Sequence, residues 1–372
     1  MAERANGPPF RAEHVGSFVR PDGLLEAARA HKAGSLDGEA YRRVQDDCIR
    51  EIVAFQDDIG MPSITDGEFR RRVWSAGFTD AVEGMGVRAE GTLAFKTDAG
   101  EVFMPPSPFA EAKLRRKGRI VTDDYEFVAA LAPRGVPKVT IASPAVMHFY
   151  LGPKSFEPSV YADRDAYFDV LAGIYRDEVA ELAAAGCAYL QIDDTAMVCN
   201  CDEAGRAAVR ARGEDPDELT AAYVDLINRA IADRPAGMTV GLHTCRGNLK
   251  GAWMAEGGYE PIAERLFNGL DVDAFFLEYD SPRAGDFAPL RHLPAGKTAV
   301  LGLISTKTPE LEKKDDLKRR IDEAAAFVPL ERLALSPQCG FSSGGGGGQV
   351  VTQDDTRRKL ELVVEVAREV WG

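Results

Sequence analysis

The sequence contains no long apolar run and no excess of positive charge. No stretch approaches the roughly 18 apolar residues that a membrane-spanning helix requires. There are 45 Lys and Arg residues against 59 Asp and Glu residues, for a formal net charge of -14 at pH 7. Such a surface repels nucleic acids and anionic membranes. We therefore expect neither of them as a partner, and a small molecule instead.

Regularly spaced cysteines and a signal-like segment are also missing. The six cysteines follow no repeating pattern, and no signal-like apolar stretch follows Met1. Disulfide frameworks belong to secreted proteins, so these features favour reduced thiols and a cytoplasmic protein. A chain of 372 residues is long enough for one large barrel domain or two average domains. A homo-oligomer is compatible with this composition.

Eight short apolar runs have the length of strands, and all but the last are followed by room for a helix. The predicted strands are 14–18, 63–66, 138–143, 189–193, 239–243, 274–278, 298–304 and 333–336. The predicted helices include 39–59, 165–185, 219–232, 311–327 and 352–371. This alternation predicts an α/β fold, a (β/α)8 TIM barrel, with the whole chain 1–372 as a single catalytic domain.

The segment of about 70–135 is too long for one crossover between neighbouring strands. We interpret it as an insertion between the second and third strands, with short strands and a helix at 123–131. It is not expected to form a separate domain.

Polar residues gather where the predicted strands end. They are Ser17, Asp66, Glu68, Ser143, Asp193, Asp194, His243, Cys245, Glu278, Ser305, Lys307 and Cys339. Buried parallel strands are otherwise apolar, so packing does not explain this distribution. In a barrel of this type the carboxyl ends of the strands carry the active site. We therefore predict an active site at that end.

Four of these residues have the chemistry of metal ligands. His243 and Cys245 are two residues apart at the end of one strand, so their side chains leave the same face. Glu278 and Cys339 each end another apolar run. Imidazole, thiolate and carboxylate together favour zinc, and a substrate can displace a carboxylate, so a catalytic zinc site is predicted. Taken alone, the His-x-Cys pair is better explained by two buried strand residues.

Three carboxylates and a serine suit a substrate, each with an alternative. Asp193 and Asp194 can perform acid/base chemistry or hold an ammonium group, but an aspartate there can also cap a helix. Glu68 can reach the barrel mouth or form a surface salt bridge with residues 70–72. Ser17 lies in the segment VGSF, whose small residues let backbone amides approach a carboxylate.

Two further features are less specific. Cys199 and Cys201 form a Cys-x-Cys pair beyond the fourth predicted strand and compete as metal ligands. The glycine run Gly344 to Gly348 lacks the Gly-Lys-Ser/Thr ending of a phosphate loop, so we interpret it as a lid that follows Cys339.

At these residues the chain resembles the cobalamin-independent methionine synthase family, in particular its single-barrel members, over nearly its whole length. The segments HTCRGN, FFLEYDS and SPQCGF are similar to those that carry the family's zinc ligands. The resemblance implies that His243, Cys245, Glu278 and Cys339 bind Zn²⁺. It also implies a (β/α)8 barrel.

Three further segments, VGS, GEF and QID, resemble the family's homocysteine pocket. The resemblance implies that Ser17, Glu68 and Asp193 hold the amino-acid end of homocysteine. The reaction implied is methyl transfer from a methyltetrahydrofolate-type donor to the zinc-bound thiolate, giving methionine.

Two segments depart from the family pattern. The third-strand segment SPAVMHFY lacks the family's tryptophan near the folate, and Lys307 occupies the position of a family histidine. By resemblance, Lys307 is a proton donor that acts beside Asp193. The donor therefore remains open between a methylated folate, a methylated corrinoid protein and another carrier. Addition of a thiol such as coenzyme M to an epoxide is an alternative reaction, and a thiol-binding protein without turnover is a third.

Overall fold

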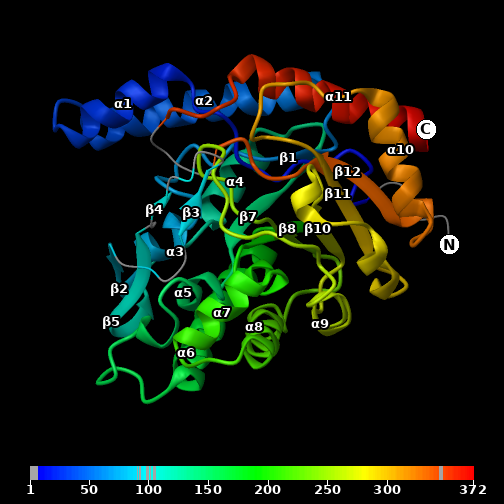
Figure 1. Ribbon diagram of the computed structural model, residues 1–372. Helices are drawn as coiled ribbons and strands as arrows, with labels where there is room; N and C mark the ends of the chain where they lie inside the picture. Colours follow the sequence, from blue (N-terminus) through cyan, green and yellow to red (C-terminus); the bar gives the residue numbers. More distant parts are fainter. Residues whose placement is uncertain are drawn as a thin grey trace.

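The computed structural model describes residues 7–89, 91, 94–97, 100, 102–103, 106–342 and 347–372. Six parallel strands form the central sheet, in the spatial order β12, β11, β10, β9, β8, β7 (Figure 1). They are β7 (Val139–Ala142), β8 (Tyr189–Asp194), β9 (Thr239–Thr244), β10 (Ala274–Glu278), β11 (Thr298–Ile304) and β12 (Leu333–Pro337). Their sequential order in space is that of consecutive βα units.

The segment 12–18 and β1 complete the ring, although the first predicted strand, 14–18, does not form a regular strand. β1 (Ser63–Ile64) pairs in parallel with β6 (Val136–Pro137), which directly precedes β7. The segment 12–18 joins β12 through a parallel bridge between Ala12 and Leu335. On its other side, Phe18 N donates to Gly67 O at 3.1 Å, beyond the end of β1. The predicted (β/α)8 barrel is confirmed.

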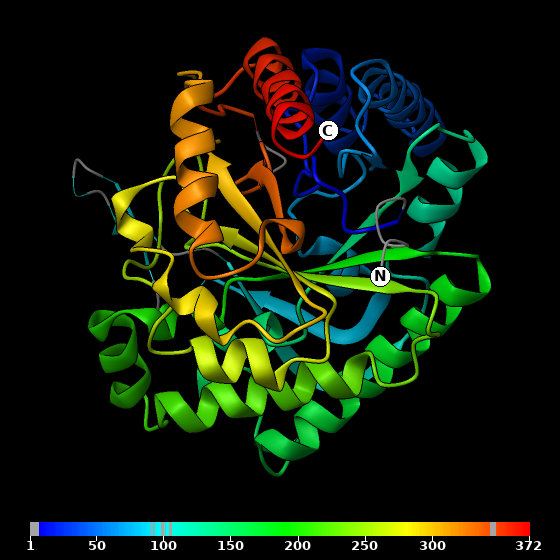
Figure 2. The same cartoon turned by 90° about the vertical axis from the view of Figure 1, so that its right-hand side faces the viewer.

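Helices surround the sheet (Figure 2). They are α1 (Asp22–Lys32), α2 (Gly38–Asp58), α5 (Val146–Phe149), α6 (Arg164–Ala184), α7 (Glu203–Ala211), α8 (Pro216–Ala230), α9 (Ala263–Gly269), α10 (Lys314–Ala325) and α11 (Gln353–Trp371). Within the described ranges, no helix is long and apolar enough to span a membrane. α1 and α2 lie near α11, so both ends of the chain cover the same side of the barrel (Figures 1 and 2).

Side-chain caps fix the starts of two of the predicted helices. α8 begins at Pro216, three residues before the predicted start, because Asp215 accepts hydrogen bonds from the amides of Asp217 and Glu218. α11 begins with a capping box between Thr352 and Asp355. The apolar periodicity located these helices but not the polar residues that start them.

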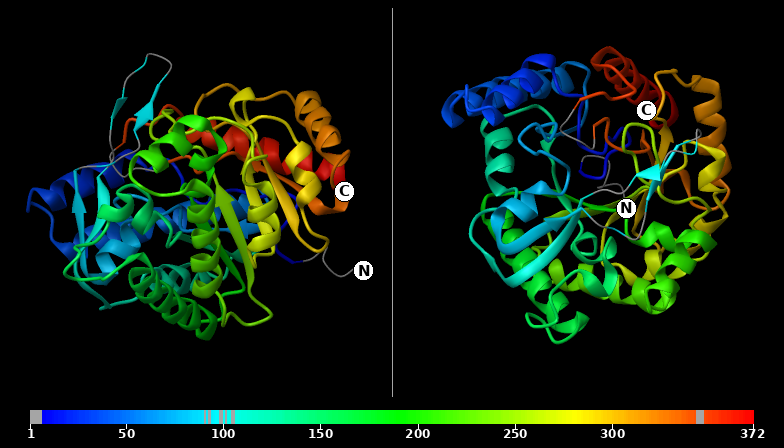
Figure 3. Two further views of the ribbon diagram at one scale, coloured as in Figure 1. Left: turned by 60° about the horizontal axis from the view of Figure 1, so that its bottom comes forward. Right: turned by 60° about the vertical axis from the view of Figure 1, so that its left-hand side comes forward.

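The insertion contains two antiparallel two-stranded sheets between two helices. Its elements are α3 (Ala76–Ala81), β2 (Val82–Arg88), β3 (Phe95–Lys96), β4 (Val102–Phe103), β5 (Ser107–Arg116) and α4 (Thr122–Ala130), with β2 paired to β5 and β3 to β4. The hairpin β3–β4 projects from the barrel (Figure 3), and Lys96 N donates to Trp253 O at 2.9 Å. Insertion and barrel therefore meet beside the loop that follows β9. The predicted helix at 123–131 is α4.

Candidate active site

A cavity of about 390 Å³ opens at the carboxyl end of the barrel strands. Its polar lining includes Ser17, Glu68, Asp193, Asp194, His243, Cys245 and Cys339. Its apolar lining includes Val73, Trp74, Val87, Phe95, Pro106, Pro108 and Leu249, mostly from the insertion. Residues from opposite ends of the sequence therefore meet in one space. Glu278 and Lys307 are not among the lining residues.

Three of the four predicted metal ligands converge. The ligand atoms of His243, Cys245 and Cys339 all lie within 4.8 Å of one another, and all three residues are buried. The two sulfurs are 3.6 Å apart, too far for a disulfide but close to the ~3.8 Å edge of a tetrahedron with metal–sulfur distances of ~2.3 Å. Neither ring nitrogen of His243 has a hydrogen-bond partner among the described residues. This donor set fits a soft divalent metal.

Glu278, the fourth predicted ligand, is placed beside this cluster but has other partners. It ends β10 and is fully buried. Its Oε1 is 3.0 Å from Lys307 Nζ, and its Oε2 accepts a hydrogen bond from Arg246 N at 2.6 Å. Both carboxylate oxygens are thus engaged, and Glu278 is not one of the three residues of the compact cluster.

Glu68 sits in a strained backbone position that directs it inward. Its φ is +60°, in the left-handed region that non-glycine residues rarely adopt. The carboxylate accepts a hydrogen bond from Thr140 Oγ1 at 2.9 Å and lies 3.6 Å from Arg71 Nη1. Arg70 pairs instead with Asp46 and Asp124. Glu68 is 3 % exposed, so the alternative salt bridge with residues 70–72 is present, through Arg71, but it is buried rather than at the surface.

The two consecutive aspartates at the end of β8 have different surroundings. Asp193 lies opposite His243 in the β8–β9 register and accepts a hydrogen bond from Gln191 Nε2 at 2.7 Å. Burial raises the pKa of Asp193 to about 7, although the charge of His243 lowers it. Asp194 Oδ1 accepts from the amides of Ala196 and Met197, both at 2.9 Å. Asp194 thus caps the turn that follows, which is the alternative to a substrate role for this residue.

Ser17 connects the segment 12–18 to the loop that holds Cys339. Ser342 N donates to Ser17 Oγ at 3.3 Å, and Phe341 N donates to Ser17 O at 3.0 Å. A Cβ atom at Gly340 would lie 2.0 Å from Ser17 Oγ, so only glycine fits beside the serine there. The position of Cys339 and that of Ser17 are therefore fixed together.

The competing cysteines are not part of the cluster. Cys199 and Cys201 are buried in the 3₁₀ turn Met197–Cys201, and neither belongs to the metal-ligand group found among the described residues. Burial raises the pKa of Cys201 to about 12, which disfavours the thiolate a metal requires. Of the glycine run, residues 344–346 lie outside the described residues. The lid remains a prediction.

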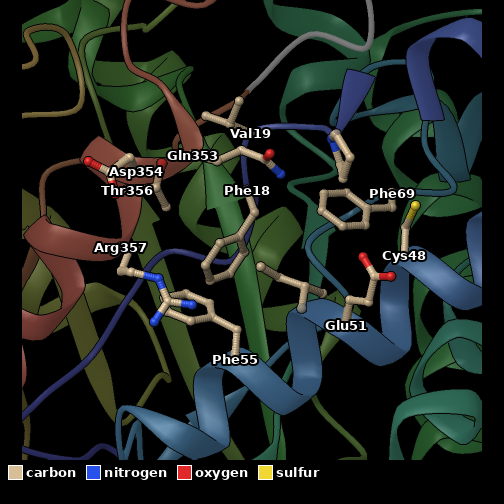
Figure 4. Close-up of a pocket in the computed structure, with 12 residues that line it drawn as sticks. Phe18, Val19, Cys48, Glu51, Phe55, Phe69, Gln353, Asp354, Thr356 and Arg357 are labelled. Atoms are coloured by element: carbon tan, nitrogen blue, oxygen red, sulfur yellow. The ribbon is translucent and has the colours of Figure 1, made fainter. Parts of the chain in front are cut away.

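A second cavity, of about 290 Å³, lies between α2, the segment 18–21 and the start of α11 (Figure 4). Phe18, Phe55 and Phe69 form much of its wall, and the Arg357 guanidinium lies over the Phe55 ring, 4.4 Å from its centre. Cys48 also lines it. None of the predicted ligands or substrate residues faces this cavity, so the chemistry belongs to the first.

Two residues of the site, Arg246 and Trp74, were not predicted from the sequence. Arg246 is fully buried, and its guanidinium donates to the carbonyl oxygens of Gly257 and Glu278. Its position directly after Cys245, within the segment HTCRGN, was the sequence feature that could have identified it. Trp74 lines the first cavity from the insertion, where no motif marked it.

Comparison with known proteins identifies the family. Residues 10–369 match the profile described as the catalytic domain of cobalamin-independent synthase. The uncharacterized protein YxjH of Bacillus subtilis strain 168 is 40 % identical over 99 % of this chain and 97 % of its own length. A methionine synthase of Pyrococcus abyssi is 26 % identical over 88 % of this chain and 84 % of its own length.

Solved structures agree. A proposed vitamin-B12-independent methionine synthase from Listeria monocytogenes has a TM-score of 0.76 and 32 % identity, over 98 % of this chain and 99 % of that one. A B12-independent methionine synthase from Shewanella sp. W3-18-1, solved with selenomethionine, has a TM-score of 0.68 and 18 % identity, over 96 % of each chain, and shares the fold. The chain therefore belongs to the family of cobalamin-independent methionine synthase catalytic domains and is a methyltransferase of that family.

Proposed function

We propose that the protein transfers a methyl group to the thiol of homocysteine, forming methionine, with Zn²⁺ as cofactor and a methyltetrahydrofolate-type molecule as donor. One observation carries the proposal: a His/Cys/Cys cluster shares a cavity with Ser17, Glu68 and Asp193. We also propose one catalytic domain, 1–372, in the cytoplasm.

His243, Cys245 and Cys339 would hold the zinc ion, with Glu278 as a fourth ligand that the substrate can displace. Two thiolates favour zinc over magnesium or calcium. The bound metal would keep the substrate thiol deprotonated at neutral pH, which makes it a nucleophile.

The chain's own polar groups would hold the amino-acid end of the substrate. Glu68 and Asp193 line the cavity as two buried carboxylates that match an ammonium group. Ser17 would contact the substrate carboxylate. Fixing both ends of homocysteine places its sulfur in line with the donor methyl group.

The same carboxylates argue against coenzyme M as the thiol. Coenzyme M carries a sulfonate in place of an amino acid, and its negative charge would face Glu68 and Asp193. Arg71 is already paired with Glu68, so a further negative charge beside these buried carboxylates is unfavourable. Methyl transfer to homocysteine is therefore favoured over the alternative epoxide opening.

The donor side is apolar. Trp74, Phe95 and Pro108 line the cavity, while Val73 and Val87 are 45 % and 57 % exposed at its rim. A small donor with a flat ring suits such a rim. The methylated corrinoid protein is the alternative donor. Lys307 and Asp193 remain the predicted catalytic residues, Lys307 as proton donor.

Zinc content and a zinc-edge X-ray absorption spectrum, with and without homocysteine, test the proposal. We expect a shell of nitrogen, oxygen and two sulfurs that gains a third sulfur when homocysteine binds. Absence of zinc, or a shell that changes with coenzyme M but not with homocysteine, would contradict it.

A further inference from the structure

The contact between Lys307 and Glu278 gives this lysine a role beyond the predicted proton transfer. Resting on the proposed function, we propose that Lys307 is a positioning residue: it receives the Glu278 carboxylate when the thiol takes its place at the metal. Glu278 then has two partners, the metal and Lys307. The lysine tunes how readily the substrate displaces the carboxylate.

The carboxylate is held in a way that requires a cation. Glu278 is fully buried, and its Oε1 contacts Lys307 Nζ at 3.0 Å. Its Oε2 and its own amide are tied locally, to Arg246 N at 2.6 Å and to the Tyr259 hydroxyl at 2.9 Å. A carboxylate that leaves a metal in such a place needs a new positive partner, because an unpaired buried charge is costly.

Arg246, the other cation near this carboxylate, is committed elsewhere. Its guanidinium donates to Gly257 O at 2.9 Å from Nε, and it stacks over the Tyr259 ring, 4.5 Å from its centre. Towards Glu278 it reaches the backbone oxygen, at 3.3 Å, rather than the carboxylate. Lys307 is therefore the side chain that can neutralise a displaced Glu278.

The surroundings of Lys307 hold its ammonium group beside Glu278. Its side chain is 7 % exposed, and Asp280 Oδ2 lies 3.8 Å from Nζ. Two carboxylates hold one ammonium group in a site screened from water. A flexible lysine with a compact charge can follow a carboxylate over a short movement.

Glu278 and the substrate thiol compete for one position at the metal, and Lys307→Met should shift this competition toward Glu278. Without the lysine, Glu278 stays on the metal, so zinc should bind roughly tenfold more tightly and homocysteine roughly 10- to 100-fold more weakly, one to two decades in Kd. Lys307→Arg keeps the cation and should recover part of the homocysteine affinity. The matched control is Lys314→Met, which removes an exposed lysine paired with Glu365 and Glu369 and should change neither constant.

The test uses zinc-loaded protein and three readouts besides turnover. Chelator competition gives the zinc affinity, calorimetry gives the homocysteine Kd, and zinc-edge absorption shows whether a sulfur is added. Equal zinc and homocysteine affinities in wild type and Lys307→Met would overturn the inference. If wild type binds no zinc, the proposed function itself fails, which is a different result.

A double-mutant cycle covers the case in which Lys307→Met does not fold. In Glu278→Gln/Lys307→Met both charges of the 3.0 Å pair are removed, so neither of the two is left buried without the other. If the lysine acts through the carboxylate, its loss from Glu278→Gln should leave the homocysteine Kd unchanged. The same loss of affinity in both backgrounds would show that Lys307 touches the substrate directly, against the inference.

Discussion

Both ends of the barrel bury charged groups, but the two ends differ in how completely their buried polar groups are hydrogen-bonded. At the amino-terminal end, Glu13 is fully buried and accepts four hydrogen bonds: from Phe10 N at 3.0 Å, Tyr189 Oη at 2.9 Å, Ser63 Oγ at 2.8 Å and Lys138 Nζ at 3.1 Å. These four donors occupy both carboxylate oxygens of Glu13, so Glu13 itself has no acceptor capacity left for a ligand. Among the described residues at this end, Nδ1 of His14 is a buried atom without a partner.

At the carboxyl-terminal end several buried polar atoms have no partner among the described residues. They include both ring nitrogens of His243, Oε1 of Gln191 and Nε2 of Gln338. Buried polar groups in folded proteins are nearly always hydrogen-bonded, so such a group of unused atoms indicates a site for a ligand. The difference teaches that buried charge alone does not locate function, and that unsatisfied buried polar atoms beside a cavity are a better guide.

The largest effect is expected at a metal ligand. Cys339→Ser replaces a soft donor with a poor one, so zinc should be lost and methyl transfer reduced more than ~10³-fold, over 4 kcal/mol in transition-state stabilisation. The melting temperature should equal that of zinc-free wild type, because Cys339 follows the end of β12. Zinc analysis, activity and calorimetry check this. Cys48→Ser, in α2, is the control, and full activity with normal zinc in Cys339→Ser would refute the ligand assignment.

Lys138→Met should have the next largest effect, on stability rather than catalysis. It leaves Glu13 buried without its cation, which costs about 3–5 kcal/mol of unfolding free energy. KM for homocysteine and zinc content should stay at wild-type values. Urea unfolding and kinetics measure both. Adding Glu13→Gln should recover part of the lost stability. If Lys138→Met weakened homocysteine binding as much as it lowered stability, the two barrel ends would not have separate roles.

The sequence predicted much of the fold because its apolar runs alternate regularly. It also placed His243, Cys245 and Cys339 together, since parallel strands bring their carboxyl ends to one edge. The pair between Lys307 and Glu278 could not be predicted, because both were assigned to other roles and nothing in their spacing links them. The capping role of Asp194 depends on the turn conformation after β8, which periodicity does not encode.

Substrate residues should give intermediate effects. Glu68→Gln and Asp193→Asn each remove a charge that we assign to the ammonium group, so KM for homocysteine should rise about 10- to 100-fold, about 1.4–2.7 kcal/mol. Zinc content should be unchanged. Stability of Asp193→Asn should hold or rise near neutral pH, since burial raises the pKa of this carboxyl. In contrast, Asp194→Asn should lower stability more than affinity, and the opposite pattern would exchange the two assignments.

The smallest effect concerns pH and the amino-terminal end. His14 is fully buried, and burial and the charge of Lys138 lower its pKa well below the ordinary value of 6.5. Above about pH 6.5 the ring is neutral in both folded and unfolded chains. Below it only the unfolded chain binds the proton, so stability should fall by up to about 1.4 kcal/mol per pH unit from this residue.

The variant His14→Gln should remove this one-proton contribution. Urea unfolding of zinc-free protein at pH 7.5, 6.5 and 5.5 gives the slopes, and wild type should lose more stability than the variant below pH 6.5. His148, also buried with a lowered pKa, titrates in both proteins and leaves a common slope that the subtraction removes. Equal slopes would mean that His14 takes up its proton in the folded state, which would contradict the lowered pKa of its buried ring.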